Sequence, residues 1–322
     1  MSPAIRAAFP GKNRLCKPVA GSRSRRSAPD AAGRLAHRTF ADGARIGARE
    51  PLSEGVRRSA RRSGRSGATA AEATTAAMGR PKILVFQHME AGHPGIFRDF
   101  LRTDGAAWQA VRLHRGEPIP DLAAFDALWV MGGPQDVWQE AEHPWLVMEK
   151  AAIREAVLAR AMPFLGICLG HQLLAAALGG AVGRATAPEI GVFEVALADG
   201  DHPFVAGLPA CGPFLQWHRA EVQRPPDGAR VLASSRNCAI QAIAVGERAF
   251  GLQCHAELDA ATLEEWLATP AAVADLRKAL GSDGPARFAA DARAHMAACN
   301  RAAWQLYANF MTLSGAAARA PA

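Results

Sequence analysis

From residue 82 onward, apolar residues fall into short runs that are separated by stretches of mixed polarity. The runs at 82–87 (KILVFQ), 127–131 (ALWVM) and 164–167 (FLGI) are typical of strands buried in a parallel sheet. Residues 94–103 and 145–161 carry their apolar side chains at helical spacing, so each predicts an amphipathic helix. Strands that alternate with helices indicate an α/β fold, in which helices cover both faces of a mostly parallel sheet.

The pattern changes near residue 181, where apolar runs follow one another with only short turns between them. Strands are predicted at 109–114 before this point and, after it, at 192–197, 214–222, 230–233, 239–245 and 249–254. Helices are predicted at 172–178, ending at a Gly-Gly pair, and within 260–312, with Asp259, Thr269 or Ser282 as candidate N-caps. We therefore expect one domain over 78–322, with a C-terminal helical extension from about residue 260.

Residues 1–77 have a different character, with 16 basic and 5 acidic residues and no sustained apolar period. Such a segment cannot bury enough apolar surface to offset its ordering entropy, so we predict a disordered basic arm. Three origins fit it. Translation can start at Met78, the arm can be an organelle transit segment, or it can be a basic tail that binds nucleic acid or acidic partners.

Outside the arm, the composition excludes several classes of function. Residues 78–322 hold 21 basic and 25 acidic residues, so we expect no nucleic-acid binding by the folded domain. The sequence contains no run of about 18 apolar residues without a charge, so we expect no membrane-spanning helix. The six cysteines form no CxxC pair and no zinc-like spacing, which predicts no metal site and fits a reducing, cytoplasmic location.

The segment 164–172 (FLGICLGHQ) runs from a predicted strand into Gly-x-Cys-x-Gly and then into a helix. This is the order of a nucleophile elbow, with Cys168 in place of serine. Gly166 and Gly170 leave room for a tight turn, which puts the sulfur at a helix N-terminus, where the thiolate is favoured. The Leu169 N–H is also placed to donate to an oxyanion. The alternative for a single GxCxG motif is a buried cysteine in a glycine-rich turn.

Two other segments bear on this choice. The segment 251–257 (GLQCHAE) ends a predicted strand, and in extended chain His255 and Glu257 point to the same side. A histidine can act as general base toward a thiol while a carboxylate orients it. Gly132 and Gly133 follow another strand and let the backbone approach a substrate, with the Gly133 N–H as the better candidate for an oxyanion. Singly, the histidine fits a structural role and the glycines an ordinary turn, but the three segments together are far more specific.

These motifs resemble those of the class I (triad) glutamine amidotransferases, in particular stand-alone proteins similar to the amidotransferase domain of GMP synthase. The matching pieces, spread over roughly 82–268, are GGP at 132–134, GICLGHQ at 166–172, EIG at 189–191, WH at 217–218 and GLQCHAE at 251–257. The resemblance implies a flavodoxin-like open sheet with helices on both faces and C-terminal helices. It also implies glutamine as the amide donor, with neither metal nor other cofactor needed.

The resemblance carries eight residue roles over to this chain. The catalytic residues would be Cys168 as nucleophile, His255 as base and Glu257 as its orienting acid. The oxyanion would be held by the N–H groups of Gly133 and Leu169. The substrate would be bound by Gln172, Gly132 and His218.

Three positions depart from the family pattern. The family usually shows Gln-Phe-His-Pro-Glu, whereas here Cys254 and Ala256 replace Phe and Pro. Ala256 loosens the segment that sets the His–Glu geometry, which would reduce or retune activity. Cys254 either packs in the core or forms a redox-sensitive thiol near the site. Arg219 stands where relatives often have Gly, and it either changes which acceptor or carboxylate is bound or lies on the surface.

Three functions are consistent with these residues. In the first, Cys168 forms a γ-glutamyl thioester with glutamine and the ammonia passes to an acceptor or a separate synthase subunit, because no GxxxxGK[ST] or SGG-type loop is present. In the second, the enzyme hydrolyses a γ-glutamyl compound outright, as in the γ-glutamyl hydrolases, which use a related fold. In the third, supported only by Ala256, the chain is a catalytically silent binding or regulatory protein.

Overall fold

The structure, a computed structural model, describes residues 81–315, so the predicted arm at 1–77 lies outside the described residues. Residues 81–315 form a nine-stranded sheet with strand order β2-β1-β3-β4-β9-β8-β7-β5-β6. The strands are β1 (Lys82–Gln87), β2 (Ala107–Arg112), β3 (Ala127–Val130), β4 (Phe164–Ile167), β5 (Ala181–Leu197), β6 (Cys211–Arg224), β7 (Arg230–Ser235), β8 (Ala242–Val245) and β9 (Ala249–Leu252). The α-helices are α2 (Phe97–Asp104), α3 (Trp145–Arg154), α4 (Leu169–Ala177), α5 (Ala260–Ala268), α6 (Pro270–Leu280) and α7 (Gly284–Leu313).

One half of the sheet is parallel, and its inner strands are buried on both faces. Strands β2, β1, β3, β4 and β9 pair in parallel, whereas β8, β7, β5 and β6 continue the sheet in antiparallel pairs. Every residue of β3 and β4 is buried. A strand that is covered on both faces has no position for a polar side chain, which explains the unbroken apolar runs in the sequence. The predicted open α/β sheet is confirmed.

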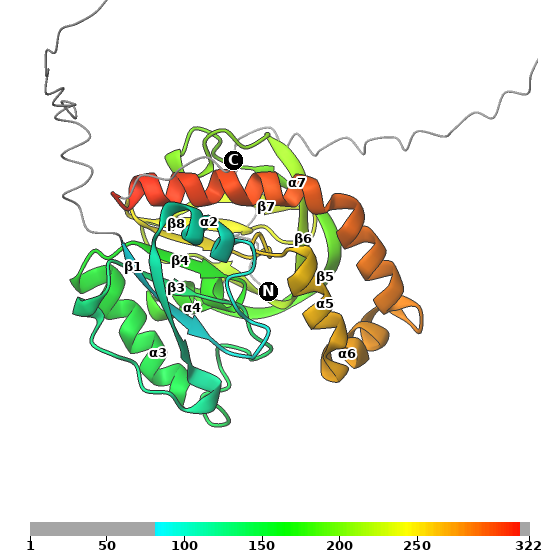
Figure 1. Cartoon of the computed structure of the whole chain (residues 1–322), viewed down its shortest axis with the longest axis horizontal. Coiled ribbons are helices and arrows are strands. Elements are labelled where there is room, and N and C mark those ends of the chain that lie inside the picture. The colour runs from blue at the N-terminus through cyan, green and yellow to red at the C-terminus, as the bar shows by residue number, and fades with distance from the viewer. Residues whose placement is uncertain (1–80, 316–322) are drawn as a thin grey trace, which may run out of the picture. The chain divides into compact units, whose positions relative to one another are not determined.

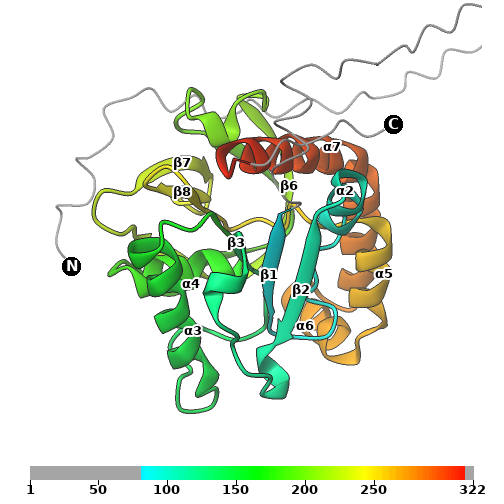
Figure 2. The ribbon, with the colours of Figure 1, turned by 60° about the vertical axis from the view of Figure 1, so that its left-hand side comes forward.

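Different helices cover the two faces of the sheet (Figures 1 and 2). Helices α2 and α7 lie along one face, and α3 and α4 lie along the other. Strand β1 shows how the alternation of side chains feeds both cores. Ile83 and Val85 join the apolar cluster that includes α2 and α7, whereas Leu84 and Phe86 join the cluster that includes α3 and α4.

An aromatic cluster fixes α7 to the sheet. The ring of Trp129, in β3, packs edge-to-face with Phe97 of α2 and Phe310 of α7, at centroid distances of 5.6 and 5.7 Å. Tyr307 packs against Trp129 at 6.4 Å and donates its hydroxyl hydrogen bond to Asp104 at 2.7 Å. Such aromatic pairs stabilise a core beyond the area that they bury. The C-terminal helix is therefore part of the main core.

The other C-terminal helices pack against the long strands β5 and β6. Trp217, in β6, lies edge-on to Trp266 of α5 and Phe288 of α7, at 5.6 and 5.0 Å. Asp259 is the N-cap of α5, and its carboxylate accepts the Thr262 N–H at 2.7 Å. The predicted C-terminal helices are confirmed, and this packing brings α5 and α6 next to β6.

The largest difference from the predicted elements is β5, which was expected at 192–197 and runs over Ala181–Leu197. Its first half is exposed or half-buried and pairs with β6 alone. No alternation of apolar residues marks this half, because pairing to a distant strand rather than burial of one face holds it in place.

Smaller differences concern where helices begin and end. Helix α4 begins at Leu169, three residues before its predicted start, because the turn at Cys168 leads directly into it. The predicted helix at 145–161 changes at Glu155 into a π-helix, Glu155–Ala159. Ser282 is not a cap, because α7 begins at Gly284 after Asp283.

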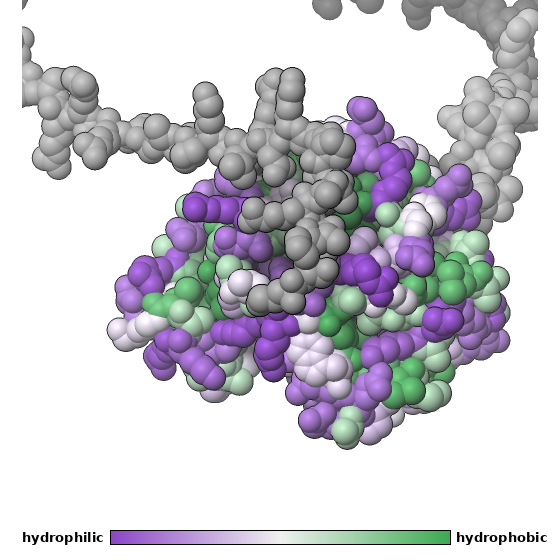
Figure 3. Space-filling view, turned by 180° about the vertical axis from the view of Figure 1, so that it is seen from behind, coloured by the Kyte–Doolittle hydropathy of each residue, from purple (hydrophilic) through white to green (hydrophobic). Residues whose placement is uncertain are grey.

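No helix within residues 81–315 has the length and apolar character that crossing a bilayer requires. Seen from behind, the described surface carries small hydrophobic groups among hydrophilic residues (Figure 3). This mixture is what amphipathic helices give when their apolar side faces the sheet.

We expect Phe310→Ala to lower the free energy of unfolding by about 3–5 kcal/mol, since it removes a buried ring from the contact between α7 and β3. Urea denaturation followed by circular dichroism measures the change. Met148 of α3 is 64% exposed, so Met148→Ala, as a control, should change stability by no more than about 0.5 kcal/mol. Equal stabilities of the two variants would show that α7 does not depend on the aromatic cluster.

Candidate active site

Cys168 alone forms the turn between β4 and α4. Its φ of 50° and ψ of −102° lie outside the regions that non-glycine residues ordinarily adopt. Backbone strain of this kind costs on the order of 1–3 kcal/mol and persists only where the surrounding structure enforces it. The Cys168 N–H donates to the Leu252 carbonyl at 2.8 Å, which ties the turn to β9.

Gly166 and Gly170 are required because the backbone passes very close to itself and to β3 at this turn. A Cβ on Gly166 would lie 2.5 Å from the backbone of Gly170, which is the collision that the sequence predicted. A Cβ on Gly170 would lie 2.0 Å from the carbonyl oxygen of Val130, so the obstacle there is the neighbouring strand. A side chain at either position would push α4 away from the sheet and move Cys168.

His255 and Glu257 meet across a turn rather than along extended chain, so this part of the prediction was wrong. Strand β9 ends at Leu252, and the Leu258 N–H donates to the His255 carbonyl at 3.4 Å. Strand alternation therefore does not apply to the two residues. Their side chains still face each other, with His255 Nδ1 at 2.8 Å from Glu257 Oε1.

Two other segments hold this turn in place. Gly95, with a φ of 50°, passes so close that a Cβ on it would lie 1.9 Å from the Glu257 carbonyl oxygen. That oxygen accepts the Ile96 N–H at 2.9 Å. From the other side, Trp266 packs edge-on to the His255 ring at 4.9 Å. The loop after β1 and helix α5 thus fix the orientation of the His–Glu pair.

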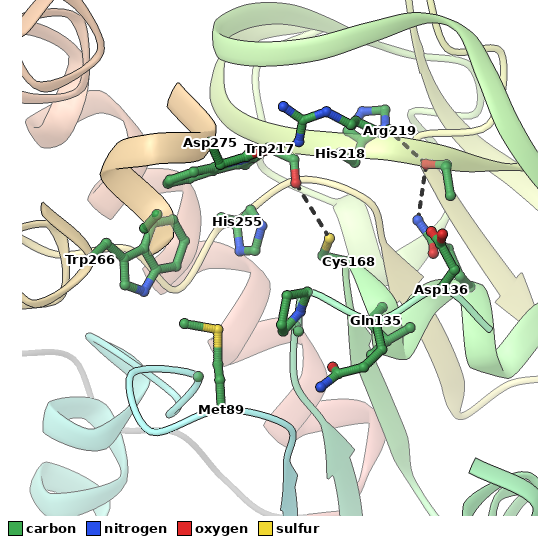
Figure 4. Close-up of a pocket in the computed structure, with 18 of the residues that line it drawn as sticks. Met89, Gln135, Asp136, Cys168, Trp217, His218, Arg219, His255, Trp266 and Asp275 are labelled. Atoms are coloured by element: carbon green, nitrogen blue, oxygen red, sulfur yellow. Dashed lines mark hydrogen bonds and ion pairs between the residues drawn. The ribbon is translucent and has the colours of Figure 1, made fainter. Parts of the chain in front are cut away.

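The surroundings of His255 set its proton affinity. Burial lowers its pKa, but the charge of Glu257, the charge and hydrogen bond of Cys168, and the hydrogen bond of Glu257 raise the pKa to about 10. An unperturbed histidine titrates near about 6.5. The raised pKa favours the doubly protonated, cationic ring at neutral pH. Figure 4 shows the His255 ring next to Cys168 in the cavity.

The glycine pair after β3 borders the same two side chains. A Cβ on Gly132 would lie 3.0 Å from His255 Cε1 and 3.5 Å from Cys168 Cβ. A Cβ on Gly133 would lie 3.1 Å from Leu169 Cδ2. The N–H groups of Gly133 and Leu169 make no hydrogen bond to any residue within 81–315, so both remain available as donors.

All eight residues predicted for the site line one cavity of about 550 Å³. They are Gly132, Gly133, Cys168, Leu169, Gln172, His218, His255 and Glu257. The structure thus brings together residues that lie up to 125 positions apart in the sequence.

Two of the predicted substrate-binding side chains already have protein partners. The amide nitrogen of Gln172 donates to the Ala220 carbonyl at 3.0 Å and to the side chain of Gln253 at 3.1 Å. His218 has Ala220 O at 3.1 Å from Nδ1 and Glu189 Oε2 at 3.3 Å from Nε2. Both residues therefore also shape the cavity wall, which their sequence motifs did not indicate.

Part of the cavity wall was not predicted from the sequence. Asp275, in α6, accepts hydrogen bonds from Arg219 Nη1 at 2.8 Å and Trp217 Nε1 at 2.9 Å. Arg219 is therefore a cavity residue held in an ion pair, and not a free surface residue. The remaining unpredicted lining residues come from loops, from β5 and β6, and from α5 and α6, and include Met89, Asp136, Arg184 and Trp266. No motif marks them, because only the packing of α5 and α6 brings these helices to the site.

The departures at 254 and 256 both fall in the core. Cys254 is buried, and burial raises the pKa of its thiol well above the ordinary value. Because the thiolate is the reactive form, this favours a packing role for Cys254 over a redox-sensitive one. Ala256 is fully buried, and the contacts of Gly95 and Ile96 described above hold the turn where the family has proline.

Comparison with known proteins places the chain in a family. Residues 101–268, slightly more than half of the sequence, match the model of the family "Glutamine amidotransferase class-I". The chain therefore belongs to the class I glutamine amidotransferases, a family of enzymes.

Individual relatives are consistent with this assignment. The A subunit of GMP synthase (glutamine-hydrolyzing) from Sulfolobus acidocaldarius is 36% identical over 151 residues, which cover 47% of this chain and 77% of that one. Gamma-glutamyl peptidase 3 from Arabidopsis thaliana is 29% identical over 184 residues, covering 53% and 72%. The crystal structure of a glutamine amidotransferase from Thermotoga maritima superposes with a TM-score of 0.66 at 26% identity, over 74% of this chain and 99% of that one. The flavodoxin-like fold is thereby confirmed.

We expect the His255 imidazole to stay protonated at pH 8, because its pKa is raised to about 10. Glu257→Gln removes the negative charge that raises this pKa and should lower it, so that the ring loses its proton at a lower pH. Nitrogen NMR of the labelled imidazole follows the titration. As a control, Glu264→Gln on the exposed side of α5 should leave the titration of His255 unchanged. If both variants titrate like the wild type, Glu257 does not set the charge of His255.

Proposed function

We propose that this protein hydrolyses the γ-amide of glutamine through a γ-glutamyl thioester on Cys168. The observation that carries the proposal is one cavity that holds a strained cysteine, a histidine paired with a buried carboxylate, and two N–H groups without partners among the described residues. A nucleophile, its acid–base partner and oxyanion donors are the parts that acyl transfer needs.

The steps of the proposed reaction follow from these positions. The Cys168 thiolate attacks the γ-carbonyl carbon, and the oxyanion accepts hydrogen bonds from the Gly133 and Leu169 N–H groups. When the C–N bond breaks, His255 gives its proton to the departing nitrogen, and ammonia leaves. His255 then takes a proton from water, the hydroxide adds to the thioester, and the C–S bond breaks to release glutamate and restore the thiolate. Throughout, Glu257 holds the imidazole ring in orientation.

We further propose that the ammonia passes to a separate synthase subunit. Support comes from three relatives named as the A subunit of GMP synthase. The match to this chain extends over about three quarters of the length of each of them. The sequence also has no GxxxxGK[ST] motif for nucleotide phosphates. A glutaminase rate that rises when the partner is added would support this assignment.

Cys168→Ala should reduce release of ammonia and glutamate from glutamine at least about a thousandfold, because it removes the nucleophile. Cys238→Ala removes another buried thiol, outside the cavity, and should keep the wild-type rate. Coupled assays of both products measure the rates. Wild-type turnover by the Cys168 variant would rule out the proposed mechanism.

A chloroketone analogue of glutamine tests the catalytically silent alternative. Labelling of Cys168 in the wild-type protein is read by mass spectrometry, and failure to label it would favour a binding protein.

A second candidate substrate is a γ-glutamyl peptide, cleaved by the same residues. The cavity, at about 550 Å³, lies in the range that holds drug-sized ligands and exceeds what a free amino acid fills. Arg219 lies in its wall, about one-third exposed, and would present a guanidinium to a carboxylate on the leaving group. The likeness to gamma-glutamyl peptidases of Arabidopsis thaliana supports this candidate.

Arg219→Gln separates the two substrates. If a γ-glutamyl peptide is the substrate, its KM should rise about tenfold or more from loss of a charged hydrogen bond, while KM for glutamine stays nearly constant. Arg102→Gln, an exposed substitution in α2, serves as control. Kinetics with glutamine and a panel of γ-glutamyl peptides decide the question. Equal effects of Arg219→Gln on both substrates would favour glutamine alone.

A further inference from the structure

Behind the glycine pair lies a buried ion pair that the proposed reaction does not use. His88 follows β1, and its Nε2 lies 2.8 Å from Oε1 of Glu149 in α3, with both side chains fully buried. Neither residue lines the cavity. Because burying two charges is unfavourable unless their geometry and other hydrogen bonds compensate, such a pair calls for a specific reason.

The second nitrogen of His88 points to the site. Its Nδ1 lies 3.2 Å from the carbonyl oxygen of Gly132, which can only accept, so Nδ1 carries a hydrogen. A carboxylate also only accepts, so Nε2 carries a hydrogen toward Glu149. Burial lowers the pKa of His88, but the charge and hydrogen bond of Glu149 and the carbonyls of Gly132 and Met131 raise it above the ordinary value. The ring is therefore a fixed double donor.

This contact determines where the Gly133 N–H points. The peptide unit that joins Gly132 to Gly133 is planar and trans, so its C=O and N–H groups point in opposite directions. When His88 holds the carbonyl on one side, the N–H is turned to the other side. A Gly-Gly unit has little conformational preference of its own, so without this contact the peptide could rotate.

Neighbouring contacts hold His88 itself. Its ring stacks on Trp145, the first residue of α3, with centroids 5.4 Å apart and planes 18° apart. Its carbonyl accepts the side-chain amide of Gln135, from the loop that follows the glycine pair, at 3.2 Å. The other oxygen of Glu149, Oε2, has no hydrogen-bond partner among the described residues. Within that part of the chain, His88 is therefore the hydrogen-bond partner of this carboxylate. A Cβ on Gly133 would lie only 2.6 Å from His88 Cβ, so the backbone of the glycine pair packs directly against the His88 side chain.

We propose that His88, held by Glu149, is a positioning residue that fixes the Gly132–Gly133 peptide so that the Gly133 N–H faces the oxyanion. This inference rests on the proposed function, since it assigns a task within acyl transfer at Cys168. His88 touches no substrate and acts only through the peptide that it holds. It therefore affects the step that forms negative charge on oxygen, and it leaves the nucleophilicity of the sulfur unaltered.

Two double variants test the proposal without leaving a buried charge unpaired. In His88→Asn/Glu149→Gln the asparagine amide can take the place of Nδ1 and donate to Gly132. In His88→Gln/Glu149→Gln the amide takes the place of Nε2, pairs with residue 149 and leaves the Gly132 carbonyl without a donor. Both pairs are neutral and differ by one methylene group, and thermal denaturation checks that both fold.

We expect kcat for the γ-glutamyl substrate to fall about a hundredfold in the Gln/Gln variant, with KM nearly constant, because an oxyanion donor is misplaced. The Asn/Gln variant should recover most of kcat. Alkylation of Cys168 by iodoacetamide, read by mass spectrometry, should proceed at the wild-type rate in both, because displacement of iodide forms no oxyanion.

Other outcomes overturn the inference. Equal kcat values in the two double variants would show that the donor to Gly132 does not matter. An alkylation rate that falls in step with kcat would show a general disturbance of Cys168. If wild-type Cys168 is alkylated but hydrolyses no γ-glutamyl compound, the proposed function fails, and the inference fails with it.

Discussion

Three neighbouring parallel strands, β3, β4 and β9, have their carboxyl ends side by side, and the glycine pair, Cys168 and the His255 turn are attached to those ends. The pairs Val130–Gly166 and Ile167–Leu252 fix their register. The glycine pair follows β3, Cys168 follows β4, and the His255 turn follows β9. Because a slip of one residue would turn each strand's side chains to the opposite face, the hydrogen bonds of the sheet set the alignment of sulfur, imidazole and peptide.

The site also depends on pairing every charge that it buries. His255 faces Glu257 on one side of the glycine pair, and His88 faces Glu149 on the other. In a low-dielectric interior an unpaired charge is strongly unfavourable, whereas a paired one with filled hydrogen bonds is rigid. The two histidine rings thus differ in the groups that lie next to their nitrogen atoms. His255 lies beside a sulfur, where the proposed reaction needs a proton donor, whereas His88 is bound between a carboxylate and a carbonyl, where we propose that it holds a peptide in place.

The cysteine–histidine pair and the outer wall of the cavity come from different parts of the chain. The parallel strands present the groups that would attack a γ-carbonyl. Residues of β6 and α6, with Arg219 and Asp275 in an ion pair, form the wall farther out. The family relatives include proteins named for glutamine hydrolysis and for γ-glutamyl peptide cleavage, which differ in what is attached to the γ-carbonyl. One fold can carry such different activities, because function depends on the site and not on the fold alone.

The sequence by itself determined the parallel core and the elbow that carries Cys168, because buried strands need unbroken apolar runs and a strained elbow needs Gly166 and Gly170 at fixed spacing. It did not determine the path of β5, the turn that joins His255 to Glu257, or the approach of α5 and α6. These depend on pairing and packing between distant segments, which leave no periodic signal. The contact of His88 with the Gly132 carbonyl, 44 positions away, was likewise decided only by the tertiary structure, since no local pattern records which carbonyl a buried histidine will meet.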